Sequence, residues 1–294
     1  MRIAIATGDP AGIGPEISAK AARDPRVLEI CEPVIVNSRL SPGEIQVGKI
    51  AAAHGRASLE AAETAIRGAL AGEYDAVVAA PHTQASIDAA GIAFDGYPSF
   101  VARVCGLAPE DGILMLCFEY QGREVRIAHV TLHASVTDAL RLISKERVRK
   151  TLDAVAETLR TLGIEKPKIA VSGINPHAGE GGLFGTEEQD TVTPALEEAR
   201  RAGIAVDGPV GADILLRKAG YDAYVVMLHD QGHVAAKLLA PNGAAALTIG
   251  TPVLFSSVAH GSALDIAGKG EAQHGTMVEA ITRVVGRRRR VPAA

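Results

Sequence analysis

The sequence is poor in aromatic residues and in cysteine. It has no tryptophan and only five phenylalanines and five tyrosines among 294 residues, so the hydrophobic core must be mainly aliphatic. The three cysteines are too few and too scattered for a disulfide framework or a zinc knuckle, and we expect reduced thiols at Cys31, Cys105 and Cys117. The apolar N-terminal run ends at Gly8 and is too short for a signal sequence or a transmembrane span. These absences favour a cytoplasmic globular protein.

The chain also lacks a strong charge of either sign. Its 30 lysines and arginines face 34 aspartates and glutamates, which gives a formal net charge of −4. A chain so close to neutrality has no general electrostatic attraction to nucleic acid or to a membrane surface, and we expect neither as a partner. We interpret the basic run Arg287–Arg290 as a solvated terminus, with a phosphate or partner contact as the alternative.

Short β-rich runs alternate with amphipathic stretches along the chain. We expect helices over Leu59–Ala71 after a Ser58 cap, over Lys145–Leu162 after a Ser144 cap, and from Thr193-Pro194 to Gly203. Strands that are apolar throughout and alternate with helices are typical of α/β proteins with a buried, mostly parallel sheet. The predicted strands are Arg2–Thr7, Pro33–Asn37, Asp75–Ala80, Val125–Leu132, Lys168–Gly173, Asp222–Leu228 and Ala245–Ile249.

Four of these strands are followed closely by a histidine, namely His82, His133, His177 and His229. In open α/β sheets, ligands bind beyond the carboxyl ends of the strands. Neutral imidazole is the most common ligand of divalent metals, and three imidazoles with one open position make a catalytic metal site. The chain has no HExxH or CxxC motif, so spacing leaves open which three converge among His82, His129, His133, His177, His229, His233 and His260.

Three glycine-rich segments suggest places where a ligand can approach the backbone. Gly8–Glu16 follows the first strand, but its glycines fall at 8, 12 and 14, so it does not match the GxGxxG fingerprint. A dinucleotide cradle and a tight strand-to-helix turn both stay open for it. Asn175–Gly182 surrounds His177 with flexible positions. In His260–Gly270, small residues allow a flat, charged cofactor to lie against the backbone, and a plain loop is the alternative.

Three charged residues near the histidines are candidates for acid–base work. Lys237, eight residues after His229, is either a surface amine or a group that binds a carboxylate or shuttles protons beside a metal. Asp213 and Asp230 are candidate acid–base groups, or carboxylates that orient a metal-bound imidazole.

Four segments carry a resemblance to a known family. They are Gly8–Glu16 (GDPAGIGPE), Asn175–Gly181 (NPHAGEG), His229–His233 (HDQGH) and His260–Gly270 (HGSALDIAGKG). Together they resemble the 4-hydroxythreonine-4-phosphate dehydrogenase (PdxA) family, in order and over nearly the whole chain. The resemblance implies a homodimer of two-domain α/β/α subunits with the isocitrate and isopropylmalate dehydrogenase fold, and an active site in the cleft between domains. We expect one domain over 1–132 with 262–294, and a second over 133–261 that carries the metal ligands and the dimer interface.

The same resemblance implies an activity and its residues. The family oxidises an alcohol with NAD+ or NADP+ and then removes CO2, using a divalent metal held by three histidines, one or more of which can come from the partner subunit. Zn2+ suits imidazole ligands best, with Mg2+, Mn2+ and Co2+ as alternatives. By motif, the metal ligands are His133, His177 and His229; the substrate-binding residues are His82, Thr83 and Lys237; the catalytic residues are Lys237, Asp213 and Asp230; and the cofactor-binding residues are His260, Gly261, Ser262, Asp265 and Gly268.

Three departures from the family pattern bear on the substrate. Ala246 and Phe255 stand where the family has an asparagine and an arginine that hold the substrate phosphate, and Ala259 replaces an aspartate. A phosphate without these partners loses strong charge-assisted hydrogen bonds. With Ala90–Ser99, His129–His133 and Lys237–Ala244, the pattern most resembles the terephthalate dihydrodiol dehydrogenase branch, which converts 1,2-dihydroxy-3,5-cyclohexadiene-1,4-dicarboxylate to protocatechuate and CO2. We therefore expect Phe255 to offer an apolar wall to a carboxylated ring, and Ala246→Asn with Phe255→Arg to restore part of a phosphate preference.

Other functions stay open at this point. The runner-up is the hydroxythreonine phosphate enzyme of pyridoxal phosphate biosynthesis, or a relative that acts on another hydroxy acid. A metal-dependent hydrolase could use the same histidines, but it would leave His260–Gly270 unexplained. A degenerate binding protein is disfavoured because the three presumed ligands and Lys237 are all present.

Overall fold

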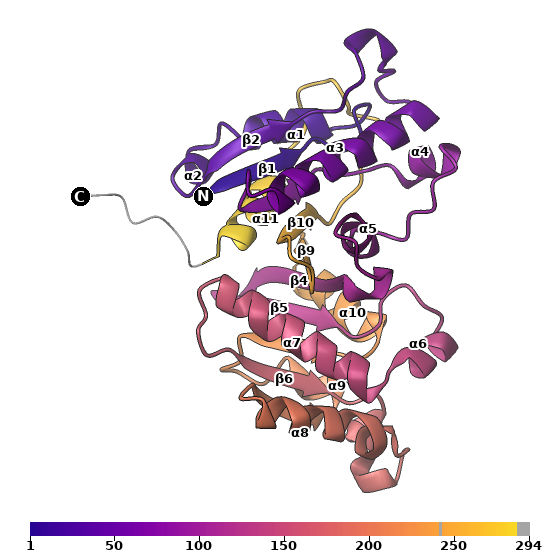
Figure 1. Ribbon diagram of the computed structural model, residues 1–294, viewed down its shortest axis with the longest axis vertical. Coiled ribbons are helices and arrows are strands. Elements are labelled where there is room, and N and C mark those ends of the chain that lie inside the picture. Colours follow the sequence, from indigo (N-terminus) through magenta and orange to yellow (C-terminus); the bar gives the residue numbers. More distant parts are fainter. Residues whose placement is uncertain (241–242, 287–294) are drawn as a thin grey trace, which may run out of the picture. The chain divides into compact units, whose positions relative to one another are not determined.

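In the computed structural model, which describes residues 1–240 and 243–286, the chain divides into two compact units (Figure 1). The first unit is Met1–Gly112 with Asn242–Ala294, and the second is Ile113–Pro241. Both divisions come earlier in the chain than the predicted domain boundaries, because each antiparallel strand pair belongs to the other unit. The pair β4 and β5 joins the second unit through β8, and the pair β9 and β10 joins the first unit through β3. The basic run Arg287–Arg290 lies outside the described residues.

The first unit has strands in the order β2-β1-β3-β10-β9. Neighbours are parallel except for β10 and β9. The strands are β1 (Arg2–Ala6), β2 (Glu32–Val36), β3 (Ala76–Ala79), β9 (Ala245–Ile249) and β10 (Phe255–Val258). The helices are α1 (Gly14–Ala21), α2 (Pro25–Leu28), α3 (Ala52–Leu70), α4 (Gln84–Ala89), α5 (Tyr97–Val104) and α11 (Gly275–Val285), with short 3-10 turns η1 (Pro42–Glu44) and η2 (Pro109–Asp111).

The second unit repeats this plan with strands in the order β4-β5-β8-β6-β7. Only β4 and β5 are antiparallel. The strands are β4 (Ile113–Tyr120), β5 (Arg123–His129), β6 (Lys168–Ser172), β7 (Ala205–Val210) and β8 (Ala223–Val226). The helices are α6 (Val136–Leu142), α7 (Lys145–Thr161), α8 (Thr193–Arg201), α9 (Ala212–Leu215) and α10 (His229–Leu239), with η3 (Pro176–Gly182) and the π-helical turn η4 (Glu188–Val192). Figure 1 shows α7 in front of these strands and α10 behind them.

The core is largely aliphatic, as the composition predicts. In the first unit, α3 and α5 bury a cluster that includes Ala4, Val77 and Ile66. Four of the ten phenylalanines and tyrosines gather in the first unit. Phe94, Tyr97, Phe100 and Phe255 form one group with ring centroids 4.9 to 6.4 Å apart. This group lies close to the functional residues described below.

All seven predicted strands are confirmed, with ends that agree or differ by at most three residues. The strands β4, β7 and β10 were not predicted. A short apolar run such as β4 has no decisive periodicity, and β7 contains Gly208-Pro209, which normally argues against a strand. The α/β class with mostly parallel strands is confirmed.

The predicted start of a helix is correct where the predicted N-cap hydrogen bond forms. Ser144 accepts a hydrogen bond from the backbone N–H of Arg147 (3.2 Å) and begins α7 as expected. Ser58 does not cap α3, which begins earlier, at Ala52; Ser58 is buried in its interior. Thr193 is not a cap either, because the turn Glu188–Val192 already leads into α8. Among the described helices, none is both long and apolar enough to cross a membrane.

Candidate active site

Three of the predicted ligands follow three adjacent strands of the second unit. His133 follows β5, His229 follows β8 and His177 follows β6. Because β8 is parallel to both β5 and β6, all three strands end at the same edge. Gln231 ties this edge together: its Oε1 accepts from the N–H groups of Met227 (2.9 Å) and Leu228 (3.0 Å), and its Nε2 donates to the carbonyl of Gly173 (3.1 Å).

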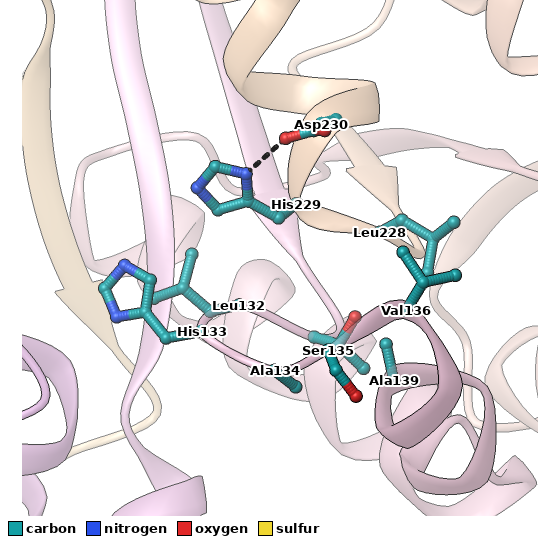
Figure 2. A pocket seen from close by; sticks show the side chains of 10 residues that line it. Leu132, His133, Ala134, Ser135, Val136, Ala139, Leu228, His229 and Asp230 are labelled. Carbon is teal, nitrogen blue, oxygen red and sulfur yellow. Dashed lines mark hydrogen bonds and ion pairs between the residues drawn. The ribbon is translucent and has the colours of Figure 1, made fainter.

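His133 and His229 line one cavity of about 470 Å3 (Figure 2). Their ring centroids are 6.0 Å apart. The Nδ1 of His229 lies 2.6 Å from Oδ1 of Asp230. Because a carboxylate only accepts hydrogen bonds, Nδ1 carries the proton and Nε2 keeps its lone pair. This is the arrangement in which a carboxylate orients a metal-binding imidazole, one of the two roles predicted for Asp230.

One face of α10 carries further polar side chains beside this pair. His233 stacks on His229, with ring centroids 3.8 Å apart and planes 7° from parallel. Burial lowers the pKa of His233 to about 4, helped by the neighbouring His229. Lys237 lies one turn further along the same face and is exposed. The residue behind His233 is His129, which is 2% exposed and whose pKa burial lowers to about 3.

His177 lies on an unusual loop. Five consecutive residues, His177 to Gly181, have positive φ angles between 45° and 79°. For residues other than glycine this left-handed conformation is costly, and it persists only where the surroundings enforce it. His177 is exposed, and its ring has an aromatic neighbour in Phe184 at 6.4 Å. Asp213 belongs to the same region, since both its carboxylate and the Cα of His177 lie beside Gly211.

Glu188 fixes the start of this loop through hydrogen bonds. The sequence analysis did not identify this residue. Its Oε1 accepts from the N–H groups of Ile174 (2.6 Å) and Asn175 (2.7 Å), and its Oε2 accepts from Nδ2 of Asn175 (3.0 Å). The side chain is buried, at 2% exposure. Burial by itself would raise the pKa of Glu188, but the hydrogen bonds from Asn175 and Ile174 outweigh it and hold that pKa below its ordinary value. The only sequence signal for Glu188 is a glutamate near a glycine-rich loop. This pattern is too common to identify Glu188 as a functional residue.

Replacing Glu188 by alanine is expected to lower the free energy of unfolding by about 2–4 kcal/mol, because two backbone N–H groups lose a charged acceptor. Urea unfolding measures this loss, with the exposed Glu197→Ala as the matched control. Because the folded pKa is lowered, the contribution is present above the ordinary value of 4.5 and disappears as the pH falls through the folded pKa. Equal stability of the Glu188 and Glu197 variants at pH 7 would contradict this role.

The first unit brings another set of polar residues to one strand edge. Asp9 follows β1, His82 and Thr83 follow β3, and Ser262 follows β10, and these three strands are parallel neighbours. Asp9 is completely buried, and its Oδ1 accepts from the N–H of Ala11 (2.8 Å). Burial lowers the pKa of His82, while the Asp9 carboxylate acts in the opposite direction. Asp9 was seen in the sequence only as part of a turn.

Several buried polar atoms at this edge have no hydrogen-bond partner within the described part of the chain: Oδ2 of Asp9, Oγ1 of Thr83, Oγ of Ser262 and OH of Tyr97. Buried polar atoms are nearly always paired in folded proteins, so unpaired ones mark a place where a ligand can supply the partner. The tight-turn interpretation of Gly8–Glu16 also fits here. Gly8 has a φ of 66°, and a Cβ there would overlap the carbonyl of Pro81.

Phe255 does not form the wall that the sequence predicted. Its side chain is 0% exposed and packs against Tyr97, with ring centroids 4.9 Å apart. The aromatic contacts of His82 come instead from Phe94 (4.8 Å) and Tyr97 (5.1 Å), both edge-on. A residue on β10 that points into the core cannot touch a ligand, and only the strand register reveals which way it points.

The predicted cofactor segment is a loop that begins after β10. His260 contacts Oγ1 of Thr276 through Nε2 (2.7 Å), so this ring is held at the start of α11. Apart from Gly261 and its two chain neighbours, no described residue comes within 4 Å of a Cβ placed on Gly261, so the backbone there is open to a flat ligand. Gly268 has a φ of 77°, and Asp265 is exposed. These features fit a dinucleotide lying against the loop.

A single copy of the chain does not bring the three predicted metal ligands together. His133 and His229 come together, but no group of three His, Cys, Asp or Glu side chains is placed to hold a metal within residues 1–240 and 243–286. The edge therefore offers two imidazoles from a single copy of the chain, with His177 on the same edge but outside the pair.

Comparison with known proteins places the chain in a family. Residues 12–284 match the family model described as pyridoxal phosphate biosynthetic protein PdxA. The chain is 45% identical to 1,2-dihydroxy-3,5-cyclohexadiene-1,4-dicarboxylate dehydrogenase from a Comamonas species, over 95% of this chain and 96% of that protein.

Solved structures agree with the sequence comparison. A terephthalate 1,2-cis-dihydrodiol dehydrogenase from Burkholderia xenovorans LB400 matches with a TM-score of 0.76 and 41% identity, covering 97% of both chains. A 4-hydroxythreonine-4-phosphate dehydrogenase from Klebsiella pneumoniae matches with a TM-score of 0.82 and 30% identity, also over 97% of both chains. Isocitrate dehydrogenase from Methylococcus capsulatus, at 15% identity and a TM-score of 0.51, shares the fold alone, over 97% of this chain and 84% of that one. The chain therefore belongs to the PdxA family of 4-hydroxythreonine-4-phosphate dehydrogenases, as its motifs indicated.

Proposed function

We propose that the protein is a cytoplasmic, metal-dependent NAD(P)+ dehydrogenase that oxidises a secondary alcohol and decarboxylates the β-keto acid so formed. The best-supported substrate is 1,2-dihydroxy-3,5-cyclohexadiene-1,4-dicarboxylate, with protocatechuate and CO2 as products. The observation that carries this proposal is the pair His133 and His229 at one strand edge, in a chain 45% identical to a dehydrogenase named for that substrate.

The residues at this edge fit a divalent metal, with Zn2+ the best match to imidazole ligands. Asp230 leaves the Nε2 lone pair of His229 available, and His133 lines the same cavity. We assign the ligands to His133, His177 and His229. Such an ion would supply Lewis acidity to the substrate hydroxyl and stabilise the negative charge that develops on oxygen.

The remaining steps fall to side chains of the chain itself. We assign removal of the hydroxyl proton to Nζ of Lys237, which shares the face of α10 with His229, or to Asp213 or Asp230 acting through a water. The carbon-bound hydrogen leaves as a hydride to nicotinamide, and the resulting ketone is β to a carboxylate, so CO2 can depart. For the cyclic diol, tautomerisation then restores an aromatic ring, which makes the sequence effectively irreversible.

We assign substrate contacts to His82 and Thr83, and cofactor contacts to His260, Gly261, Ser262, Asp265 and Gly268. Within the described residues, Oγ1 of Thr83 and Oγ of Ser262 have no hydrogen-bond partner, which supports these assignments because a bound ligand would satisfy both atoms. Asp9 joins this set through its unpaired Oδ2 and its electrostatic effect on His82.

We further propose a homodimer in which a second copy completes the metal site. Of the described large apolar side chains, the three most exposed all lie in the second unit: Val136 (68%), Leu183 (72%) and Leu238 (75%). They lie on α6 just after His133, beyond the end of the His177 loop, and on the helix that begins at His229. Exposed apolar side chains on the segments that carry an incomplete ligand set fit a partner subunit that covers them.

The proposed activity is tested by absorbance at 340 nm, with purified protein, NAD+ or NADP+ and the diol dicarboxylate. We expect NADH or NADPH formation that depends on a divalent metal, with CO2 released in equal amount. A Lys237→Ala variant should lose most of the turnover. Hydrolytic activity without any nicotinamide reduction would refute the proposal in favour of a metal-dependent hydrolase.

A further inference from the structure

Two histidines of the second unit, the buried His129 and the partly buried His233, have no part in the proposed reaction. His129 ends β5, and His233 lies one turn into α10. Together with His229 and His133 they form a continuous row of rings, with centroid separations of 4.8 Å, 3.8 Å and 6.0 Å along the row. Core packing alone does not explain such a row, because buried polar atoms are nearly always paired and apolar side chains would fill the same space without polar nitrogens.

The row is anchored at its inner end. The Nδ1 of His129 lies 3.3 Å from the carbonyl of Leu114. Its Nε2 is buried and has no hydrogen-bond partner in the described residues. That nitrogen lies against Gly232, where a Cβ would overlap it, so any other residue would force α10 away from β5. His129 is therefore fixed by the strand on one side and by the helix backbone on the other.

His233 lies between His129 and His229 and contacts both rings. Its Nδ1 lies 3.3 Å from the carbonyl of His229, which sets the tilt of its ring. The His229 ring is then held on two sides, by the parallel face of His233 and by the carboxylate of Asp230 at 2.6 Å. Two restraints on one side chain leave few orientations for the Nε2 lone pair.

The same geometry argues against His233 as a ligand of the same ion. The lone pair of an imidazole nitrogen lies in the plane of its ring. Because the rings of His229 and His233 are stacked within 7° of parallel, their lone pairs run side by side and do not converge. A role through His229 is the one that this arrangement permits.

We propose that His233, backed by His129 across Gly232, is a positioning residue that orients His229 for metal binding. This inference rests on the proposed function, in which His229 is a ligand. Residues that orient a metal ligand typically change affinity by about 10- to 100-fold when they are removed.

The test measures Zn2+ affinity of the full-length protein by competition with a chromophoric chelator, and the visible absorption spectrum of the Co2+ form. We expect His233→Ala to weaken Zn2+ binding by about tenfold or more and to alter the Co2+ spectrum. His233→Phe keeps a ring for stacking but no nitrogen, and should retain affinity within about threefold. His274→Ala, a partly exposed histidine of the first unit paired with Asp24, is the control and should bind like the original.

The outcomes separate this inference from the proposed function. Unchanged Zn2+ affinity in His233→Ala, together with a loss in His229→Ala, would overturn the positioning role and leave the metal site standing. Unchanged affinity in His229→Ala would overturn the proposed function. An equal loss in His233→Ala and His233→Phe, with both variants folded by circular dichroism, would show that a nitrogen of His233 is needed and would also overturn positioning by stacking.

Discussion

The His177→Ala protein is expected to fold normally and to lose both its metal and its turnover. His177 is exposed, so its removal takes little from the core. Loss of metal charge stabilisation worth several kcal/mol corresponds to at least about a thousandfold in rate. Metal content by mass spectrometry and turnover with NAD+ measure the two effects. Full activity of this variant after exhaustive chelation would remove His177 from the site.

Mixing two inactive variants tests where the third ligand comes from. If His177 serves a site built on His133 and His229 of the partner copy, dimers of one His177→Ala and one His229→Ala subunit contain one intact site. Random reassociation should then restore up to about a quarter of the original activity, because half of the dimers are mixed and each has one working site. No recovery in verified mixed dimers would mean that the His177 and the His229 of one site come from the same chain.

The second large effect concerns the choice of substrate. We expect kcat/KM with NAD+ to be about a hundredfold or more higher for the diol dicarboxylate than for 4-hydroxythreonine 4-phosphate. A factor of ten corresponds to ~1.4 kcal/mol, and a phosphate that lacks its charged and amide partners loses more than twice that. Ala246, which is only partly buried on β9, offers no donor side chain.

Side-by-side kinetics of the two substrates decide this prediction. A preference for 4-hydroxythreonine 4-phosphate would show that the branch assignment is wrong and leave the family membership intact. If neither substrate reacts while metal and nicotinamide both bind, the substrate is another unphosphorylated hydroxy acid or diol.

The burial of Phe255 changes how phosphate binding could be restored. Phe255→Arg would place a guanidinium against Tyr97 in the core of the first unit, where the side chain is 0% exposed. Burying an unpaired charge costs several kcal/mol, so we expect a lower melting temperature instead of a shifted preference. Ala246→Asn, at a partly exposed position, is the matched substitution that the fold should tolerate.

Some of the candidate site could be predicted because its signals are local. The apolar runs before His133, His177 and His229 identify buried parallel strands, and chain polarity alone then sends these residues to one edge of a sheet. Ser144 identifies the start of α7 for a similar reason, since a cap acts within three residues. The family motifs are likewise short and contiguous.

What local signals could not supply are contacts between residues far apart in sequence. Glu188 holds Ile174 and Asn175 through hydrogen bonds that depend on how a loop closes, and Asp9 faces His82 only because β1 and β3 are neighbours. The burial of Phe255 depends on strand register, because a one-residue shift would turn its side chain to the other face of the sheet.

The amino-acid sequence by itself therefore determined the α/β class, the order of most strands and helices, the family and the histidines available to a metal. The tertiary structure decided which of these histidines meet: His133 with His229, and His233 against His229 with His129 behind it. The physical reason is the sequence separation over which the two kinds of interaction act. Strand and helix formation follow from patterns within a few residues, whereas the row of imidazoles needs β5 and α10, a hundred residues apart in the chain, to pack closely at Gly232.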